Sequence, residues 1–120
     1  MTPAILQQVT GLPWVAEHRF AREVVGSAPG IRQRIKDAGL RDWRFDFACH
    51  PICLAVEIEG GAWVGGRHTR GKGFEDDLRK YGAAMRLGWT IYRCSHSMVR
   101  SGEAYDTIAA VCRILQEGKA

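Results

Sequence analysis

The residues between 43 and 59 form two runs of alternating apolar and polar side chains, separated by a short turn signal. The first run, Trp-Arg-Phe-Asp-Phe-Ala at residues 43–48, is expected to place its three aromatic residues on one face of a strand. In the second run, residues 52–59, every second residue from Ile52 to Ile58 is aliphatic. His50-Pro51 lies between the runs, and proline favours the second position of a tight turn. This pattern predicts a β-hairpin that buries one face.

The alternation also restricts how the two strands of this hairpin pair. A one-residue slip would turn one apolar face to the wrong side, so only shifts by two residues are allowed. A four-residue turn at 50–53 places Asp46 directly opposite Glu57, and the next allowed register places them diagonally. In either register Asp46, Glu57 and Glu59 are expected to share the polar face. Like charges at this spacing repel, so three carboxylates on one face favour binding of a cation.

The rest of the chain predicts helices and further strands around the hairpin. The order strand, strand, strand, helix, strand, helix predicts an antiparallel meander and a crossover, with the last strand parallel to the one that carries Glu57. We therefore expect an α/β fold with a four-stranded mixed sheet flanked by helices. Residues 1–120 should form one domain with a helical insertion at about 26–40. The expected elements are a helix at 4–9, strands at 15–20 and 89–94, and helices at about 31–38, from 74 to Gly88, and from 104 to 115.

Composition restricts the class of protein more than its function. The chain is 46% hydrophobic and 25% charged, as in ordinary globular proteins, and no apolar run reaches the roughly 18 residues of a membrane span. The start of the sequence has no basic region typical of a secretory signal, so we expect four cysteine thiols in a reducing cytoplasm. A formal net charge of +4 is compatible with a polyanionic partner. The oligomeric state is left open, with a homodimer among the options.

A glycine-rich segment at 60–73 follows the hairpin and is expected to be a long functional loop. Its glycines let backbone amides approach phosphates, which favours DNA contact by Arg67, Arg70 and Lys72 over a merely solubilising role. His68, between two arginines, is expected to act in proton transfer or phosphate binding, although it could also be an exposed loop residue. Two roles stay open for Trp63, stacking on DNA bases and packing at a hinge.

An acidic residue on one strand and a Glu-x-Glu on the next is the arrangement of a magnesium-dependent phosphodiesterase site. Mg²⁺ prefers oxygen ligands and commonly takes one or two carboxylates, leaving other positions to water and substrate phosphate. The competing interpretation is a solvated sheet face on which the acids form weak ion pairs with Arg44 and Arg19.

The sequence around these acids resembles the PD-(D/E)XK, or restriction-endonuclease-like, nuclease superfamily. The resemblance covers residues 43–99. Within that superfamily it is similar to small phage and bacterial single-domain nucleases related to the very-short-patch repair endonuclease. The residues that carry the likeness are Phe45-Asp46-Phe47, Val56-Glu57-Ile58-Glu59-Gly60-Gly61, Gly61-x-Trp63-x-x-Gly66-Arg67-His68-Thr69-Arg70, Asp77-x-x-Lys80-Tyr81 and Gly88-Trp89.

This resemblance implies an enzyme that hydrolyses DNA in repair or recombination. Asp46 and Glu57 would be its metal ligands, with the carbonyl of Ile58 as a third. Mg²⁺ would be the cofactor and Mn²⁺ would substitute for it. The products would carry 5′-phosphate and 3′-hydroxyl ends.

The sequence departs from the family pattern at two places. The usual lysine two residues after the second acid is Glu59 here, which is implied as a base or second metal ligand. Lys80 on the following helix is then implied in the role of that lysine, with a surface ion pair to Asp77 as the alternative. Many members carry a further acid on an N-terminal helix, but residues 3–10 contain none, and Glu17 is the nearest substitute.

Two other classes of protein compete with the nuclease interpretation. One is a non-catalytic nucleic-acid-binding module on the same fold. The other is an interaction domain stabilised by zinc, although the ligand spacings are unusual for zinc and a strand or helix cysteine is commonly a buried thiol. The residues that could supply such zinc ligands are Cys49, His50, Cys53, Cys94 and His96.

Overall fold

The computed structural model describes residues 1–60, 63–64, 67–68 and 72–118, with the backbone alone at 63–64, 67–68 and 72. No helix among these residues is long and apolar enough to cross a membrane. The elements in chain order are α1 (Pro3–Thr10), β1 (Val15–His18), α2 (Phe20–Val25), α3 (Ile31–Asp37), β2 (Phe45–Cys49), the 3₁₀ turn η1 (His50–Ile52), β3 (Leu54–Glu59), β4 (Trp63–Val64), β5 (Arg67–His68), α4 (Lys72–Arg86), β6 (Thr90–Ser95), α5 (His96–Ser101) and α6 (Glu103–Glu117).

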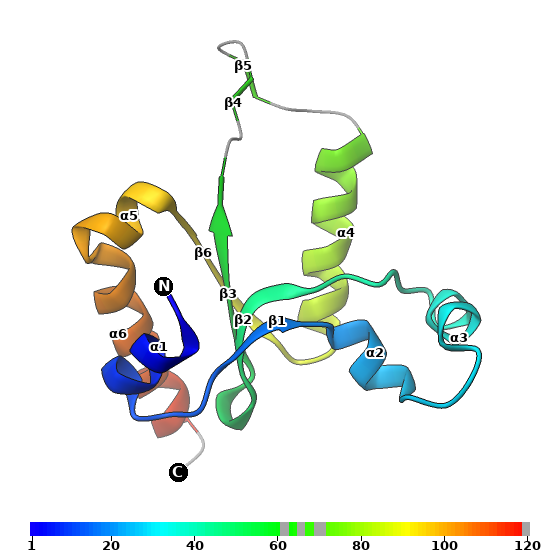
Figure 1. Cartoon of the computed structure of the whole chain (residues 1–120), viewed down its shortest axis with the longest axis horizontal. Coiled ribbons are helices and arrows are strands. Elements are labelled where there is room, and N and C mark those ends of the chain that lie inside the picture. Colours follow the sequence, from blue (N-terminus) through cyan, green and yellow to red (C-terminus); the bar gives the residue numbers. More distant parts are fainter. Residues whose placement is uncertain (61–62, 65–66, 69–71, 119–120) are drawn as a thin grey trace.

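Four strands form one open mixed sheet in the order β1-β2-β3-β6. β2 is antiparallel to both β1 and β3, and β6 runs parallel to β3 after the helix α4 (Figure 1). This arrangement confirms the predicted mixed sheet flanked by helices. The glycine-rich segment differs from the expected loop, because β4 and β5 pair there as a separate two-stranded antiparallel sheet.

The predicted hairpin is present in the predicted register. Phe47 pairs with Val56 and Cys49 pairs with Leu54, as a four-residue turn at 50–53 requires. The turn contains η1 and ends at Cys53, whose φ of 48° is in the left-handed region. Alternation allowed this register and the one shifted by two residues, and the structure has the one with the four-residue turn at 50–53.

Helices cover both faces of the sheet (Figure 1). On one face α1, α5 and α6 lie over the larger core, and on the other α2 and α4 lie over a smaller one, with α3 beside α2. The larger core contains Leu6, Trp14, Phe47, Cys49, Ile52, Leu54, Val56, Cys94, Ala104, Ile108 and Cys112. The smaller core contains Phe20, Phe45, Ala48, Ala55, Ala84 and Trp89.

The aromatic residues of β2 do not share one face, contrary to the prediction from alternation. Phe47 belongs to the larger core, whereas Phe45 belongs to the smaller core and stacks on Phe20 with ring centroids 4.3 Å apart. The strands deviate from regular geometry between these positions. Asp46 directs its carboxylate at the backbone of β3, and Glu17, at the matching position of β1, has a φ of 55°. Only a few per cent of residues other than glycine have a positive φ, so β1 is locally distorted at Glu17.

The segment between β1 and β2 is more helical than the sequence indicated. The strand predicted at 15–20 ends at His18, because Phe20 begins α2 and is buried in the smaller core. The helix predicted at about 31–38 is α3, and Gly39 after it has a φ of 76°. Arg22 holds α2 in place through a two-nitrogen contact with Asp42, at 3.0 and 2.7 Å.

Replacing Phe45 with alanine tests the smaller core. Phe45 is fully buried, so Phe45→Ala should lower the free energy of unfolding by about 3–5 kcal/mol. Phe74→Ala is the matched control, because Phe74 is 50% exposed on α4, and its effect should be about 0.5 kcal/mol or less. Urea unfolding of the two variants measures the difference, and equal losses would contradict the placement of Phe45.

Candidate functional site

Asp46 and Glu57 come together where β2 and β3 lie beside α4, but the ligand atoms of the three described acids Asp46, Glu57 and Glu59 do not all lie within 4.8 Å of one another. Asp46 is on β2, Glu57 and Glu59 are on β3, and the facing side chains are Lys80 and Tyr81 of α4. Glu57 and Glu59 contact the same helix because alternate residues of a strand point to the same face.

Glu57 is the buried member of this group, with 6% of its surface exposed. Its Oε1 accepts a hydrogen bond from Nζ of Lys80, which is itself 12% exposed. Its Oε2 lies 3.4 Å from the backbone N–H of Asp46, which donates to it. The Lys80 ammonium also lies 6.0 Å from the centroid of the Phe45 ring. The predicted site lysine therefore bonds Glu57, and within the described part of the chain the alternative ion pair between Lys80 and Asp77 does not form.

Asp46 makes the reciprocal contact across the hairpin. Its Oδ2 accepts a hydrogen bond of 2.8 Å from the backbone N–H of Ile58. Each of the two acids is thus held by the backbone of the strand that carries the other. Their carboxylates converge without depending on flexible surface side chains, as a preorganised binding site requires.

The charge state of Glu57 reflects its burial and the neighbouring Asp46 and Lys80 side chains. Burial, with a smaller contribution from the Asp46 carboxylate, raises the pKa of Glu57 to about 7 against the opposing effect of the Lys80 ammonium. When both acids are ionised, two negative charges face one positive charge in a site largely shielded from water. A divalent cation would balance this excess.

Glu59 has different partners. Its Oε1 accepts hydrogen bonds from the Tyr81 hydroxyl at 3.1 Å and from Nε of Arg93 at 2.6 Å. The Arg93 guanidinium also lies over the Tyr81 ring, 4.6 Å from its centroid. Burial and the nearby Glu57 carboxylate raise the pKa of Tyr81. The role of Glu59 as base or metal ligand stays a prediction, and in this structure its carboxylate binds Arg93 and Tyr81.

The other predicted ligand on a strand, Glu17, lies at the surface. Its carboxylate forms an ion pair with Arg44, and both side chains are more than half exposed. Arg19 bonds Asp42 at 2.9 Å. The competing interpretation, in which Arg44 and Arg19 neutralise the three acids of the hairpin, therefore does not describe this structure.

The predicted DNA-binding and proton-transfer residues follow directly after β3. The side chains of Trp63, Arg67, His68, Arg70 and Lys72 lie outside the described residues. In the backbone, Trp63 of β4 pairs with His68 of β5, and Val64 pairs with Arg67. Their roles stay predictions.

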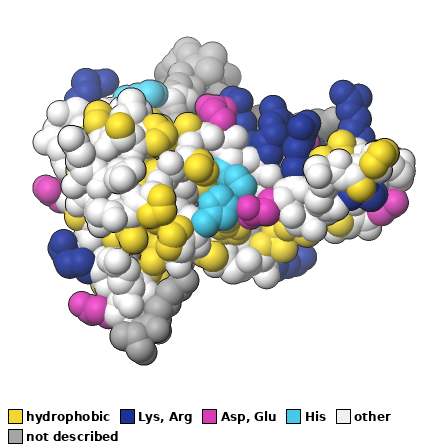
Figure 2. All heavy atoms as spheres, turned by 60° about the horizontal axis from the view of Figure 1, so that its bottom comes forward, with side chains coloured by type: hydrophobic (Ala, Val, Ile, Leu, Met, Phe, Trp, Pro, Cys, Tyr) yellow, Lys and Arg dark blue, Asp and Glu magenta, His cyan; other side chains and the backbone are white. Residues whose placement is uncertain are grey.

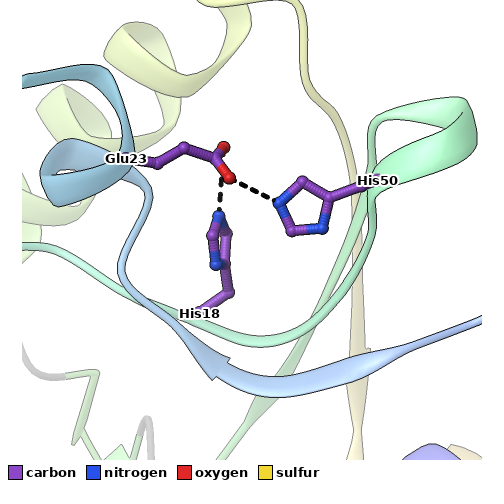
Figure 3. Close-up of side chains that lie close together, drawn as sticks. All are labelled: His18, Glu23 and His50. Atoms are coloured by element: carbon purple, nitrogen blue, oxygen red, sulfur yellow. Dashed lines mark hydrogen bonds and ion pairs between the residues drawn. The ribbon is translucent and has the colours of Figure 1, made fainter. Parts of the chain in front are cut away.

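The structure also contains a cluster that sequence reasoning missed. His18, Glu23 and His50 are the one group of His, Cys, Asp and Glu side chains in the described part of the chain whose ligand atoms all lie within 4.8 Å of one another (Figure 3). The sequence placed His50 in the hairpin turn and among the ligands of a cysteine-based zinc site, without His18 or Glu23, and Glu23 lies on a helix that the pattern did not predict. No cysteine among the described residues belongs to such a group, so the cysteine-based zinc site gains no support.

Comparisons of the chain with protein-family models, with curated proteins and with solved structures found no match. The proposed function therefore rests on the chemistry of Asp46, Glu57 and Lys80.

The pKa of Glu57 predicts how stability changes with pH. The folded protein keeps this proton up to about pH 7, whereas the unfolded chain loses it near 4.5, so stability falls as pH rises between these values. At about 1.4 kcal/mol per pKa unit, the ionised form should lower the free energy of unfolding by roughly 3 kcal/mol. Glu57→Gln should remove this loss and be more stable than the parent near pH 8 in chelator.

Urea unfolding at several pH values from about 5 to about 8 measures this difference. Glu117→Gln, which alters an exposed acid at the end of α6, is the control and should follow the parent. Parallel curves for the parent and Glu57→Gln would show that Glu57 does not titrate as described.

Proposed function

We propose that this chain is a Mg²⁺-dependent endodeoxyribonuclease of the PD-(D/E)XK type, with Asp46 and Glu57 as metal ligands. The observation that carries this proposal is the buried Glu57 carboxylate on the interior strand β3, held between Asp46 and Lys80. A buried acid next to a second acid is costly for folding, and such groups cluster at functional sites. The mixed sheet with a following helix that carries the lysine is compatible with the resemblance.

The donor set fits Mg²⁺. Two carboxylates from neighbouring strands supply hard oxygen ligands, and Mg²⁺ needs no more than one or two from the protein. A divalent cation would balance the excess negative charge around Glu57. Glu59, bound to Arg93 and Tyr81, is not needed in this set.

The residues around the acids have separate tasks in phosphodiester hydrolysis. When bound, Mg²⁺ supplies a Lewis acid that polarises the phosphate and lowers the pKa of an attacking water. Asp46 and Glu57 orient it, because hydrogen bonds from the backbone hold both side chains. Lys80 has three donor hydrogens, so it can bond Glu57 and also donate to a phosphate oxygen on which negative charge accumulates.

DNA is the proposed substrate because cationic residues follow the acids directly. Arg67, Arg70 and Lys72 lie within 13 residues of Glu59, in a chain with a formal net charge of +4. Phosphate contacts position a nuclease on DNA without reading its sequence. His68 is the proposed proton-transfer group, and Trp63 the proposed stacking residue.

A DNA-binding module without activity is the rival interpretation. Such a module has no use for the Asp46–Glu57 pair, since carboxylates repel phosphates and the buried one lowers stability. Cleavage that depends on Mg²⁺ distinguishes the two, because the rival binds DNA and leaves it intact.

Removing either ligand charge should abolish cleavage while leaving DNA binding nearly unchanged. Asp46→Asn and Glu57→Gln keep the shape of the side chains and lose the anionic oxygens that hold the metal. Glu117→Gln is the control and should cleave like the parent. The measurement is cleavage of a panel of duplex, branched and single-stranded DNAs with Mg²⁺ or Mn²⁺, beside binding of the same DNAs in chelator.

Full turnover in Asp46→Asn or Glu57→Gln would eliminate this metal site. Binding of the DNAs by the parent without any cleavage would favour the non-catalytic module instead.

The cationic residues after β3 predict the salt dependence of DNA binding. Replacing Arg67, Arg70 and Lys72 together with alanine should reduce the slope of log affinity against log salt by about 0.9 for each DNA phosphate that the protein no longer neutralises. The decrease in affinity should be similar for different DNA sequences. His68→Ala should keep the parental slope and lower the single-turnover rate by about 10²-fold. An unchanged slope in the triple variant would show that this segment does not contact DNA.

A further inference from the structure

His18, Glu23 and His50 come from three separate elements and meet at the surface of the molecule (Figure 3). His18 ends β1, Glu23 lies in α2, and His50 begins the turn after β2. Glu23 lies between the two imidazoles, with Oε1 at 3.3 Å from Nε2 of His18 and Oε2 at 2.7 Å from Nε2 of His50. On the face shown in Figure 2, histidine and acidic side chains adjoin, with hydrophobic side chains around them.

The two imidazole rings are held firmly. Their centroids are 4.4 Å apart at an angle of 79°, and both rings pack against Trp89, at 5.8 and 5.4 Å. Nε2 of His18 is buried and makes no hydrogen bond in the described structure, although it points at Glu23. A buried ring nitrogen without a partner costs free energy unless something satisfies it.

The partners of the Glu23 carboxylate among the described residues are the two imidazoles. The nearby guanidinium groups of Arg19 and Arg22 both bond Asp42. Among the described residues, no lysine or arginine forms an ion pair with Glu23.

We propose that His18, Glu23 and His50 bind a divalent transition-metal ion, for which Zn²⁺ is the best match. Two imidazole nitrogens and one carboxylate oxygen form a donor set that suits zinc and not Mg²⁺. Tetrahedral zinc with bonds of about 2.0–2.2 Å separates its ligand atoms by about 3.3–3.6 Å. One ligand atom from each of the three residues lies within 4.8 Å of the other two, and Nε2 of His18 is already 3.3 Å from Oε1 of Glu23, so modest side-chain rotations would complete this arrangement.

The ion would fasten elements that are far apart in the sequence. A shallow pocket of about 600 Å³ lies over the cluster, so a fourth coordination position can be filled from solvent. Binding would connect β1, α2 and the hairpin turn, and would hold the helical segment between β1 and β2 against the sheet. This site shares no residue with the proposed nuclease centre, and its test does not depend on the nuclease proposal.

Zinc titration of the full-length protein tests the site. After chelator treatment and dialysis, isothermal titration calorimetry should give one Zn²⁺ per chain. Glu23→Gln and His50→Gln should each weaken this binding by at least about a hundredfold, because each removes a direct ligand. His96→Gln changes an exposed histidine on α5 and should bind like the parent. Cys53→Ser is the control for thiol ligands and should also bind like the parent.

A second readout separates metal binding from misfolding. The melting temperature of the parent should rise by roughly 10 °C at a hundredfold excess of Zn²⁺ over its Kd, and neither ligand variant should show this rise. Co²⁺ in place of Zn²⁺ should give visible d–d absorption in the parent that both variants lose. Zinc affinity that is unchanged in both ligand variants, or lost in Cys53→Ser, would overturn the proposal, as would the absence of stoichiometric binding.

Discussion

The buried contact between Glu57 and Lys80 joins the sheet to α4, and the arrangement of the candidate site depends on it. Lys80 reaches Glu57 because α4 packs beside the sheet as the crossover between β3 and the parallel strand β6. The contact keeps a carboxylate with 6% exposure at a position where an unpaired charge would be very costly. Hydrogen bonds from the backbone of Asp46 to Glu57, and of Ile58 to Asp46, then fix both acids on neighbouring strands.

The burial of Glu57 also makes the site a source of instability. Burial raises the pKa of Glu57 to about 7, so near neutral pH its ionised form carries a free-energy cost that Lys80 offsets only in part. Apolar side chains of similar size often serve a buried position at least as well as an ion pair. A chain that holds two acids here gives up folding free energy, and binding of a cation would return some of it. The pKa of Glu57 thus connects the stability of the fold with its proposed chemistry.

Sequence patterns predicted the parts of the fold that depend on regular periodicity. Alternation restricted the hairpin to two registers, of which the structure has the one with the four-residue turn, and the parallel strand β6 followed from the crossover. Alternation failed at Phe45, because Asp46 bonds the backbone of Ile58 and the strand is distorted there. A side-chain contact with another strand leaves no trace in local periodicity. The contact between Glu59 and Arg93, 34 residues apart, is set by the packing of β6 and was likewise not predictable.

The cluster of His18, Glu23 and His50 was missed for a related reason, since its three residues belong to three elements and have no common spacing. Its place relative to the acids has a chemical consequence. His50 is four residues beyond Asp46, about 13 Å along an extended strand, so the two donor sets lie toward opposite ends of one hairpin. Zinc binds imidazole nitrogen well, whereas Mg²⁺ prefers oxygen. A site with two imidazole nitrogens would therefore take up zinc in preference to Mg²⁺, whereas the oxygen ligands of Asp46 and Glu57 suit Mg²⁺.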